Sequence, residues 1–582
     1  MADQQNRFFH RKKIMTIFFI CALVLIGLFM RLLYLMVWRA DYYEEAATRL
    51  HERERSIKAA RGRILDRNGV VLADNKTVCT VSVIHNQITE PEKVIAMLVK
   101  ELGISETEAR KRVEKYSSME RVKSNVDKSI GDRIREYDLA GVKVDEDYKR
   151  YYPYGDLASK VLGFTGGDNQ GIIGLEVIYE ETLQGEPGMI LTVTDAKGIE
   201  VDTAGERRVE PVPGWDLRIS IDRNIQEYAT QLAEQACATK EADSVYIIAM
   251  DPRNGEILAM VNYPEFDLND PYTLPELTEW KEDGSIAVVD PSTLTAEQKQ
   301  EKLNAMWRNG CINDTYEPGS TFKIITSLEY IREHPDTYQN YRYQCVGSIK
   351  WGEDRIQCYH GSVHGSVDFT RSFAKSCNTS YANIGLSLDR KEFGDTLNQL
   401  LFNQKLPVTF QHSVSNLVVD ENTSDADMMQ ISIGQGAAGI TPLQLNMITC
   451  AIANNGRLMK PYLVDSVKNS AGSITREFKP SAYGDLMTET EAAAMQALME
   501  AVVTEGTASR LKDLSYTAAG KTGSAEYGTV KGESHAWFTG YAPAENPQVC
   551  VTIIIEGAGA GGDYAVPIAK RIFDAYLTEP QS

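Results

Sequence analysis

The sequence predicts an α+β protein: an antiparallel sheet with a helical subdomain, preceded by a mixed α/β module and one transmembrane helix. Three observations support this. The apolar segment 14–38 is long enough to cross a bilayer. Strand-like runs within residues 244–261 and 515–556 enclose a long stretch, residues 295–500, in which helical patterns dominate. The 582 residues also exceed the size of one ordinary domain.

The composition is that of a folded protein with an acidic surface. Apolar residues make up 43% of the chain and charged residues 24%, and the formal net charge is −20. Binding to nucleic acid needs a basic footprint, so we expect no nucleic-acid partner.

The apolar segment 14–38 predicts an uncleaved membrane anchor. Residues 14–30 carry no charge, and the apolar run resumes after Arg31. The basic residues Arg7, Arg11, Lys12 and Lys13 precede it, which makes residues 1–13 a cytoplasmic tail. A cleaved signal peptide is the alternative, but the run is too long and no small-x-small site follows it. We therefore expect a single-pass protein of the cell membrane, with the remainder of the chain on the outer face.

Residues 39–221 are expected to form the N-terminal module. Residues 42–57 are rich in Glu, Ala and Arg and predict a helix that leaves the membrane. Asn68-Gly69 lies between two apolar runs and predicts a hairpin, because both residues tolerate positive φ. Ser105 begins a capped helix further on.

Residues 222–582 are expected to form the second domain. A helix begins near Asp222, and residues 244–250 and 257–261 predict two strands joined by a turn. Further strands are expected at 515–526, 536–541 and 549–556, with a last helix at 567–577. Residues 557–562 fit G-x-G-x-x-G, but no further strand with an acidic residue follows. A turn is the better interpretation, and no cofactor is expected.

The nine cysteines are spread thinly, so no disulfide framework is predicted. Cys345 and Cys358 are the best candidate pair, and free buried thiols are at least as compatible with the sequence. No CxxC motif is present, and His360 and His364 lack the intervening glutamate of a metalloprotease motif. We therefore expect no metal site.

The motif Ser320-Thr321-Phe322-Lys323 points to nucleophilic catalysis. A serine hydroxyl needs a neighbouring group to take its proton, and residues i and i+3 share one face of a helix. The turn residues before Ser320 and the apolar residues after Lys323 are typical of a helix that enters a core. Burial or a second cation, such as Lys521, would lower the pKa of Lys323 enough for it to act as a base.

Two further motifs complete the pattern. Ser376 and Asn378 are two residues apart, so one turn could direct both side chains the same way, although Ser-Cys-Asn alone is more often an ordinary polar loop. Lys521-Thr522-Gly523-Ser524 follows small residues that would let a substrate backbone lie along a strand edge. Lys521, Thr522 and Ser524 could bind a carboxylate, and the backbone N–H groups of Ser320 and Ser524 could form an oxyanion hole.

Together these motifs resemble those of the class B penicillin-binding proteins, the bitopic D,D-transpeptidases of peptidoglycan synthesis. The similarity extends to residues 61–69, 174–176, 316–320, 434–436 and 537–541. Two positions depart from the family pattern. Residues 308–312 read Arg-Asn-Gly-Cys-Ile where the family usually has Arg-Asn-Arg-Ala, and Ser524 replaces the commoner Thr.

The resemblance implies a pedestal or dimerisation-type module at 39–221 and a transpeptidase domain at 222–582. It implies a nucleophile at Ser320, a general base at Lys323 and a proton relay at Ser376. Asn378, Lys521, Thr522, Gly523 and Ser524 would bind the substrate. The donor would be a stem peptide ending in D-Ala-D-Ala, the acceptor an amine on a second stem, and β-lactams covalent inhibitors. A membrane-embedded glycan polymerase is the implied partner.

Two other functions are compatible with the same motifs. A D,D-carboxypeptidase or β-lactamase-type hydrolase would share the acyl-enzyme, and the anchor with its large N-terminal module favours the transpeptidase. A β-lactam sensor or an assembly scaffold would be non-catalytic. About 13 residues precede the anchor, too few for a signalling domain, and a scaffold would not need the Ser320–Lys323 pair. The motifs are compatible with roles in elongation, division or sporulation.

Overall fold

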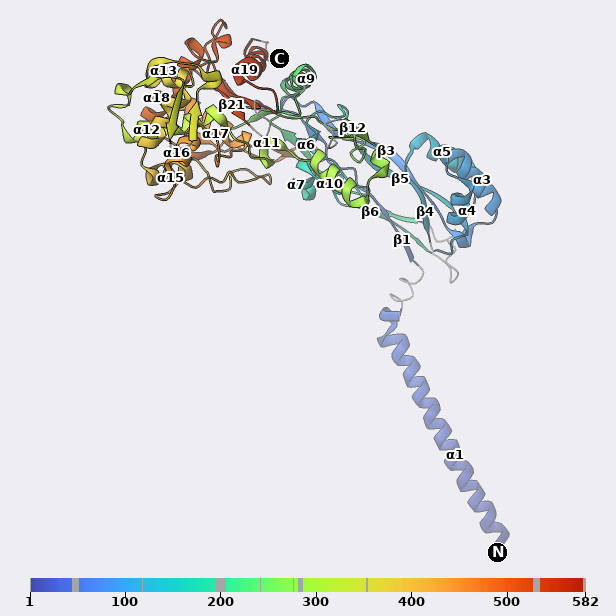
Figure 1. The fold of residues 1–582 in the computed structure, drawn as a ribbon. Coiled ribbons are helices and arrows are strands. Elements are labelled where there is room, and N and C mark those ends of the chain that lie inside the picture. Colours follow the sequence, from blue (N-terminus) through green and yellow to red (C-terminus); the bar gives the residue numbers. More distant parts are fainter. Residues whose placement is uncertain are drawn as a thin grey trace. The chain divides into compact units, whose positions relative to one another are not determined.

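The structure is a computed structural model that describes residues 2–43, 52–117, 119–193, 206–240, 242–275, 277–280, 286–351, 354–526 and 534–578. The chain divides into two compact units. The first comprises residues 1–59, 77–149 and 186–212, and the second comprises residues 60–76, 150–185 and 213–582. Figure 1 shows the elements coloured along the sequence. The division does not follow a single cut near residue 221, because the chain passes between the units more than once.

The apolar N-terminal segment forms a long helix. Helix α1 spans Ala2–Leu33 and continues as one π-helical turn, η1, at Tyr34–Trp38 (Figure 1). The stretch Lys13–Trp38 has 26 residues, and its most apolar 18 residues have a mean hydropathy of 2.5 and are not buried in the protein. Its length and its exposed apolar side chains are those of a single-pass membrane anchor, as predicted.

The prediction of a helix at 42–57 was wrong for its last part. Residues Glu52–Ile57 form strand β1, which pairs antiparallel with β6 (Gly188–Val193). Strand β7 (Glu206–Val209) completes this three-stranded sheet of the first unit. Pairing with a strand more than 130 residues away outweighs the local helix propensity of Glu and Arg. Residues 44–51 lie outside the described residues.

The rest of the first unit is a small sheet covered by helices. Strand β3 (Val71–Val83) pairs with β4 (Glu120–Asp127) and β5 (Val142–Tyr151). A separate hydrophobic core here includes Cys79, Val94 and Leu98. The helices are α3 (Pro91–Leu102), α4 (Glu106–Glu114) and α5 (Lys128–Glu136). The Ser105 side chain accepts a hydrogen bond from Glu108 N and caps α4, as predicted.

In the second unit the predicted Asn68-Gly69 hairpin is present. Strand β2 (Ile64–Leu65) pairs antiparallel with the start of β3 and parallel with β8 (Asp216–Ile219). Strands β18 (Val464–Lys468) and β19 (Ile474–Glu477) extend the sheet beyond β8. Short helices α6 (Ser159–Leu162), α7 (Gly174–Ile178) and α8 (Glu180–Leu183) lie in the same unit.

A five-stranded antiparallel sheet in the order β10-β9-β23-β22-β21 is the centre of the second unit. Helices α9 (Arg223–Lys240) and α19 (Gly561–Thr578) pack against it and against each other. The strands are β9 (Val245–Met250), β10 (Ile257–Tyr263), β21 (Ala519–Glu526), β22 (Ser534–Ala542) and β23 (Val549–Ile555). All strands predicted for this sheet are therefore confirmed. The glycine run 557–562 joins β23 to α19, which begins earlier than predicted.

The helical subdomain lies between β10 and β21 in sequence. Its helices are α10 (Ala296–Met306), α11 (Gly310–Asn313), α12 (Lys323–Glu333), α13 (Phe369–Ala374), α14 (Asn378–Ser387), α15 (Arg390–Gln399), α16 (Asp425–Ile431), α17 (Pro442–Ala453) and α18 (Glu489–Thr504). Helix α17 packs on the central sheet, where Thr449 and Thr539 hydroxyls hydrogen-bond at 2.7 Å, and α18 packs on β21.

Short two-stranded ladders precede α10 or lie between these helices in sequence. They are β11 (Leu277–Trp280) with β12 (Ile286–Val289), β13 (Arg342–Cys345) with β16 (Gly365–Asp368), β14 (Ser348–Trp351) with β15 (Asp354–Gln357), and β17 (Arg457–Met459) with β20 (Ala482–Asp485).

Candidate active site

Ser320 lies in a 3₁₀ turn, η4 (Gly319–Phe322), that leads directly into α12. Gly319 has φ +52°, and a Cβ there would lie 2.4 Å from Ser524 O, so this position needs glycine for both its conformation and its space. Gly319 N also donates to Gly434 O at 2.9 Å. The turn is thereby seated against β21, which brings the serine motif to the strand that carries Lys521.

Lys323 makes hydrogen bonds to three of the other predicted site residues. Its side chain is fully buried, and Nζ donates to Ser320 Oγ at 3.0 Å, to Asn378 Oδ1 at 2.6 Å and to Ser376 O at 2.9 Å. Burial lowers the pKa of Lys323 to about 7, although the sulfur atoms of Cys377 and Cys358 act in the opposite direction. A neutral amine is therefore accessible near neutral pH, 3.0 Å from the hydroxyl whose proton it would accept.

Ser376 occupies a backbone position that usually belongs to glycine. Helix α13 ends in a Schellman motif, in which Cys377 N donates to Ser372 O at 2.9 Å and Ser376 N donates to Phe373 O at 3.0 Å. Ser376 is the left-handed residue of this cap, with φ +54°. An L-residue in this conformation costs about 1–2 kcal/mol. The cap turns the chain sharply and directs the hydroxyl toward the two lysines.

Lys521 approaches the same hydroxyl from β21. Its Nζ donates to Ser376 Oγ at 3.0 Å and to Thr522 O at 2.8 Å, and the side chain is fully buried. Lys323 Nζ reaches that Oγ from the other direction at 3.3 Å. Burial, followed by repulsion from Lys323, lowers the pKa of Lys521 well below its usual range. Ser376 Oγ thus bridges two buried amines.

Asn378 is the first residue of α14, and both the oxygen and the nitrogen of its side-chain amide are hydrogen-bonded. Its Oδ1 accepts the hydrogen bond from Lys323, while Nδ2 donates to Gln357 O at 2.8 Å. The structure therefore joins Ser320, Lys323, Ser376, Asn378 and Lys521 in one hydrogen-bonded chain.

The remaining predicted residues lie beside this chain of contacts on β21. Alternation along a strand places Thr522 and Ser524 on the face opposite to Lys521. Thr522 Oγ1 and Thr507 Oγ1 hydrogen-bond at 2.6 Å, and Ser524 Oγ accepts from Gly561 N at 3.4 Å. Gly523 permits close packing, since a Cβ there would lie 2.8 Å from Pro318 O.

Sequence reasoning missed several residues that build the site. Trp537 Nε1 donates to Glu317 O at 3.0 Å and so supports the turn before Ser320. Gln357 contributes only its carbonyl oxygen, which no sequence motif reveals.

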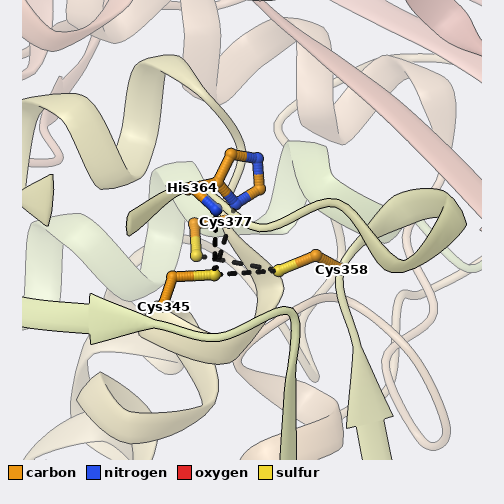
Figure 2. Close-up of side chains that lie close together, drawn as sticks. All are labelled: Cys345, Cys358, His364 and Cys377. Carbon is orange, nitrogen blue, oxygen red and sulfur yellow. Dashed lines mark hydrogen bonds between the residues drawn. The ribbon is translucent and has the colours of Figure 1, made fainter. Parts of the chain in front are cut away.

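Sequence reasoning also missed a cluster formed by Cys345, Cys358, His364 and Cys377, whose sulfur and ring nitrogen atoms all lie within 4.8 Å of one another (Figure 2). The signal was available as C-x₁₂-C-x₅-H-x₁₂-C, but this spacing is not a familiar metal motif.

The fold is an antiparallel sheet with a helical subdomain. It carries a serine one helical turn before a buried lysine, and a second lysine lies on the adjoining strand. Together these features define a serine acyl-transfer enzyme of the penicillin-binding type. Comparison with known proteins agrees. Residues 245–574 match the penicillin-binding protein transpeptidase domain, and residues 56–219 match the penicillin-binding protein dimerisation domain.

Relatives match over nearly the whole chain. Stage V sporulation protein D of Bacillus subtilis is 30% identical over 98% of this chain and 86% of its own length. Peptidoglycan D,D-transpeptidase MrdA of Acinetobacter baumannii is 27% identical over 99% of this chain and 88% of its own. The fold is shared with penicillin-binding protein 2X of Streptococcus thermophilus, with a TM-score of 0.71, 19% identity, and coverage of 90% of this chain and 80% of that one.

The chain therefore belongs to the penicillin-binding protein transpeptidase family. It is a class B penicillin-binding protein, a serine-type transpeptidase domain preceded by a dimerisation domain.

Proposed function

We propose that this protein crosslinks peptidoglycan as a D,D-transpeptidase, with Ser320 as the nucleophile and Lys323 as its general base. The observation that carries the proposal is the 3.0 Å hydrogen bond between Lys323 Nζ and Ser320 Oγ, made by a lysine whose pKa burial lowers to about 7. The peptidoglycan substrate is supported by relatives named as peptidoglycan D,D-transpeptidases.

Acylation begins when Ser320 Oγ attacks the carbonyl carbon of the penultimate D-Ala of a donor stem peptide. Lys323 accepts the hydroxyl proton as the C–O bond forms. The proton passes through Ser376, whose Oγ lies 3.3 Å from Lys323 Nζ, to the nitrogen of the breaking peptide bond. The terminal D-Ala leaves as an amine, and an ester on Ser320 remains. Lys521 holds the relay hydroxyl in place at 3.0 Å.

An amine of a second stem peptide then attacks the ester carbonyl. Its proton travels back along the same relay and restores the Ser320 hydroxyl, and a new peptide bond links the two stems. The backbone N–H groups of Ser320 and Ser524 stabilise the oxyanion in both steps. β-Lactams enter as donor mimics and acylate Ser320.

The donor peptide lies along β21 as an added strand. The hydroxyls of Thr522 and Ser524, which lie on one face of this strand, bind the terminal carboxylate, while Lys521 on the other face holds Ser376. Gly523 lets the strand lie close to the serine turn. Asn378 receives the peptide amide of the donor, in a geometry set by its contacts with Lys323 and Gln357.

Residues 1–13 face the cytoplasm because basic residues precede the anchor at 14–38, and the module 39–221 and the transpeptidase domain 222–582 lie on the outer face. Glycan polymerisation comes from a membrane-embedded partner that contacts the anchor or the N-terminal module. A related solved structure, 24% identical with a TM-score of 0.70 over 90% of this chain and 99% of that one, is a complex between PBP2 and MreC from Helicobacter pylori.

The test is covalent labelling of the purified full-length protein by a fluorescent penicillin, followed over time by intact mass. We expect one stable adduct on the wild type and none on Ser320→Ala. Stoichiometric labelling of the alanine variant would contradict the nucleophile assignment. Rapid loss of the adduct, with turnover of a chromogenic β-lactam, would favour the hydrolase instead.

A further inference from the structure

Both lysines of the proposed active site lie over an aromatic ring. Lys323 Nζ is 5.3 Å from the centre of the Tyr381 ring, and Lys521 Nζ is 5.6 Å from the centre of the Phe373 ring. All four side chains are fully buried. The face of an aromatic ring carries partial negative charge and attracts a cation within about 6 Å of its centre. Each ring therefore favours the ammonium form of the lysine that lies over it.

The two rings come from the helices on either side of the Ser376 loop. Phe373 lies near the end of α13, three residues before Ser376, and Tyr381 lies in the first turn of α14, three residues after Asn378. The centres of the two rings are 6.4 Å apart. The same chain reversal that directs Ser376 and Asn378 toward the lysines thus also places both rings.

The Tyr381 ring is held in place by the helix that carries Lys323. Tyr381 OH and Ser327 Oγ are hydrogen-bonded at 2.6 Å, and Ser327 follows Lys323 by four residues on α12, so the two share a face of that helix. Burial raises the pKa of the Tyr381 hydroxyl above its usual range, which keeps the phenol neutral. The attraction on Lys323 therefore comes from the ring face and not from a phenolate charge.

The hydrogen bonds of the two Nζ atoms bring no negative charge. They are made with neutral groups, namely the side chains of Ser320, Ser376 and Asn378 and the carbonyl oxygens of Ser376 and Thr522. In the part of the chain that the structure describes, no Asp or Glu forms an ion pair with Lys323 or Lys521. A buried ammonium ion without a carboxylate partner is costly, and a ring face offsets part of that cost.

Few titratable groups face Lys323. They are Lys521 on β21, Cys358 after β15, Cys377 before α14 and Tyr381 itself. Two further helices pack on α12. Helix α18 reaches it through Glu491, which pairs with Arg332, and α15 reaches it through the neutral Thr396. Substitutions of the rings leave these groups in place, so a change in the titration of Lys323 reports on the rings.

We propose that Tyr381 and Phe373 are positioning residues for proton transfer, with the Tyr381 ring stabilising the ammonium ion that forms on Lys323 and the Phe373 ring stabilising the ammonium ion of Lys521. The inference rests on the general-base role proposed for Lys323. In the step concerned the Ser320 O–H bond breaks and an N–H bond forms on Lys323, and neither ring exchanges a proton. The Phe373 ring acts indirectly, because a charged Lys521 repels a proton from Lys323.

The test is the pH profile of acylation of the full-length protein by fluorescent penicillin, measured through the range near pH 7 in which Lys323 titrates. Tyr381→Leu removes the ring, so Lys323 should lose its proton more readily. The midpoint of the profile should fall by about one pH unit, and the rate at the high-pH plateau should fall by up to about tenfold. Tyr381→Phe keeps the ring and should keep the wild-type midpoint. A midpoint shared by Tyr381→Leu and the wild type would overturn the proposal, and so would equal shifts in Tyr381→Leu and Tyr381→Phe.

Phe373→Leu should shift the midpoint in the opposite direction. Without this ring Lys521 holds its proton less tightly, repulsion on Lys323 weakens, and the midpoint should rise by less than it falls in Tyr381→Leu. A general loosening of the core would move both variants the same way, and that outcome would contradict the role of Phe373.

A fluorinated series covers the case in which the leucine variants do not fold. Phenylalanine carrying none, one, two or three fluorine atoms in place of Tyr381 keeps the ring shape, while each fluorine withdraws negative charge from the ring face. The midpoint should fall stepwise along the series, with circular dichroism as the control for folding. A midpoint that ignores fluorination would rule out the ring face as the cause. If the wild type is not labelled, or its rate does not rise with pH, the proposed role of Lys323 fails and this inference fails with it. If the wild type behaves as expected and the variants do not, only the inference fails.

Discussion

Lys521 Nζ lies 3.0 Å from Ser376 Oγ, although 145 residues separate them in the chain. This contact joins the strand that would hold the substrate to the loop that would move the proton. Since Ser376 Oγ also lies 3.3 Å from Lys323 Nζ, two cations of equal charge converge on one hydroxyl. Both amines cannot be protonated there without mutual repulsion, so the arrangement favours one neutral lysine.

The pH dependence of acylation follows from this arrangement. Lys323 must be neutral to accept the Ser320 proton, and its pKa is lowered to about 7, so the acylation rate should rise as the pH rises through about 7. Titratable groups that face it are Lys521, Cys358, Cys377 and Tyr381. The rate of labelling by fluorescent penicillin should be measured across this range, with circular dichroism as the control for folding. A flat or falling profile would show that Lys323 is not the base.

Substitutions of Ser376 should separate conformation from chemistry. Ser376→Gly and Ser376→Ala both remove the hydroxyl, and we expect acylation to fall by about 10²–10⁴-fold in each. Only glycine relieves the left-handed backbone at φ +54°, so Ser376→Gly should be more stable than Ser376→Ala by roughly 1 kcal/mol. Chemical denaturation measures the difference. Equal stability of the two variants would contradict the strained cap, and near-normal acylation of either would exclude the relay.

Gly319 should be intolerant of any side chain. In Gly319→Ala the new Cβ would lie 2.4 Å from Ser524 O, so the serine turn and β21 must move apart. We expect destabilisation of about 1–3 kcal/mol beyond the cost of the backbone conformation, together with loss of acylation. Gly69→Ala is the control, since Gly69 also has a positive φ, +87°, but open space around it. Similar losses of stability in both variants would show that the contact with Ser524 is unimportant.

The buried ion pairs of Glu176 should be essential to the second unit. Glu176 lies 2.5 Å from Arg61 Nε and 2.6 Å from Arg150 Nε, and all three side chains are almost completely buried. Glu176→Gln removes the carboxylate that pairs with Arg150 and leaves Arg61 paired with Glu180, which should cost about 3–5 kcal/mol of unfolding free energy. The exposed pair of Glu106 and Arg110 provides the comparison, and Glu106→Gln should cost less than about 1 kcal/mol. Thermal and chemical denaturation should rank the two variants in this order, and the reverse order would be inconsistent with the burial of Glu176.

Features that depend on neighbours in the chain were predictable from the sequence. The apolar length of the anchor, the Asn68-Gly69 hairpin, the cap at Ser105 and the strands β9, β10, β22 and β23 follow from local periodicity and turn chemistry. The pairing of Ser320 with Lys323 belongs here too, because three residues bring two side chains onto one face of a helical turn.

Contacts between distant segments were decided only when the chain folded. Residues 52–57 have the composition of a helix but form a strand, because β6 offers a partner that local propensity does not describe. Cys345, Cys358, His364 and Cys377 looked unrelated in the sequence, where 12, 5 and 12 residues lie between them, and the folded chain brings their side chains together. Local sequence is enough to specify an anchored protein with a serine–lysine motif. The positions of Lys521 and Gln357 relative to Ser376 come from the tertiary structure, because packing of the sheet and helices fixes distances that sequence separation leaves free.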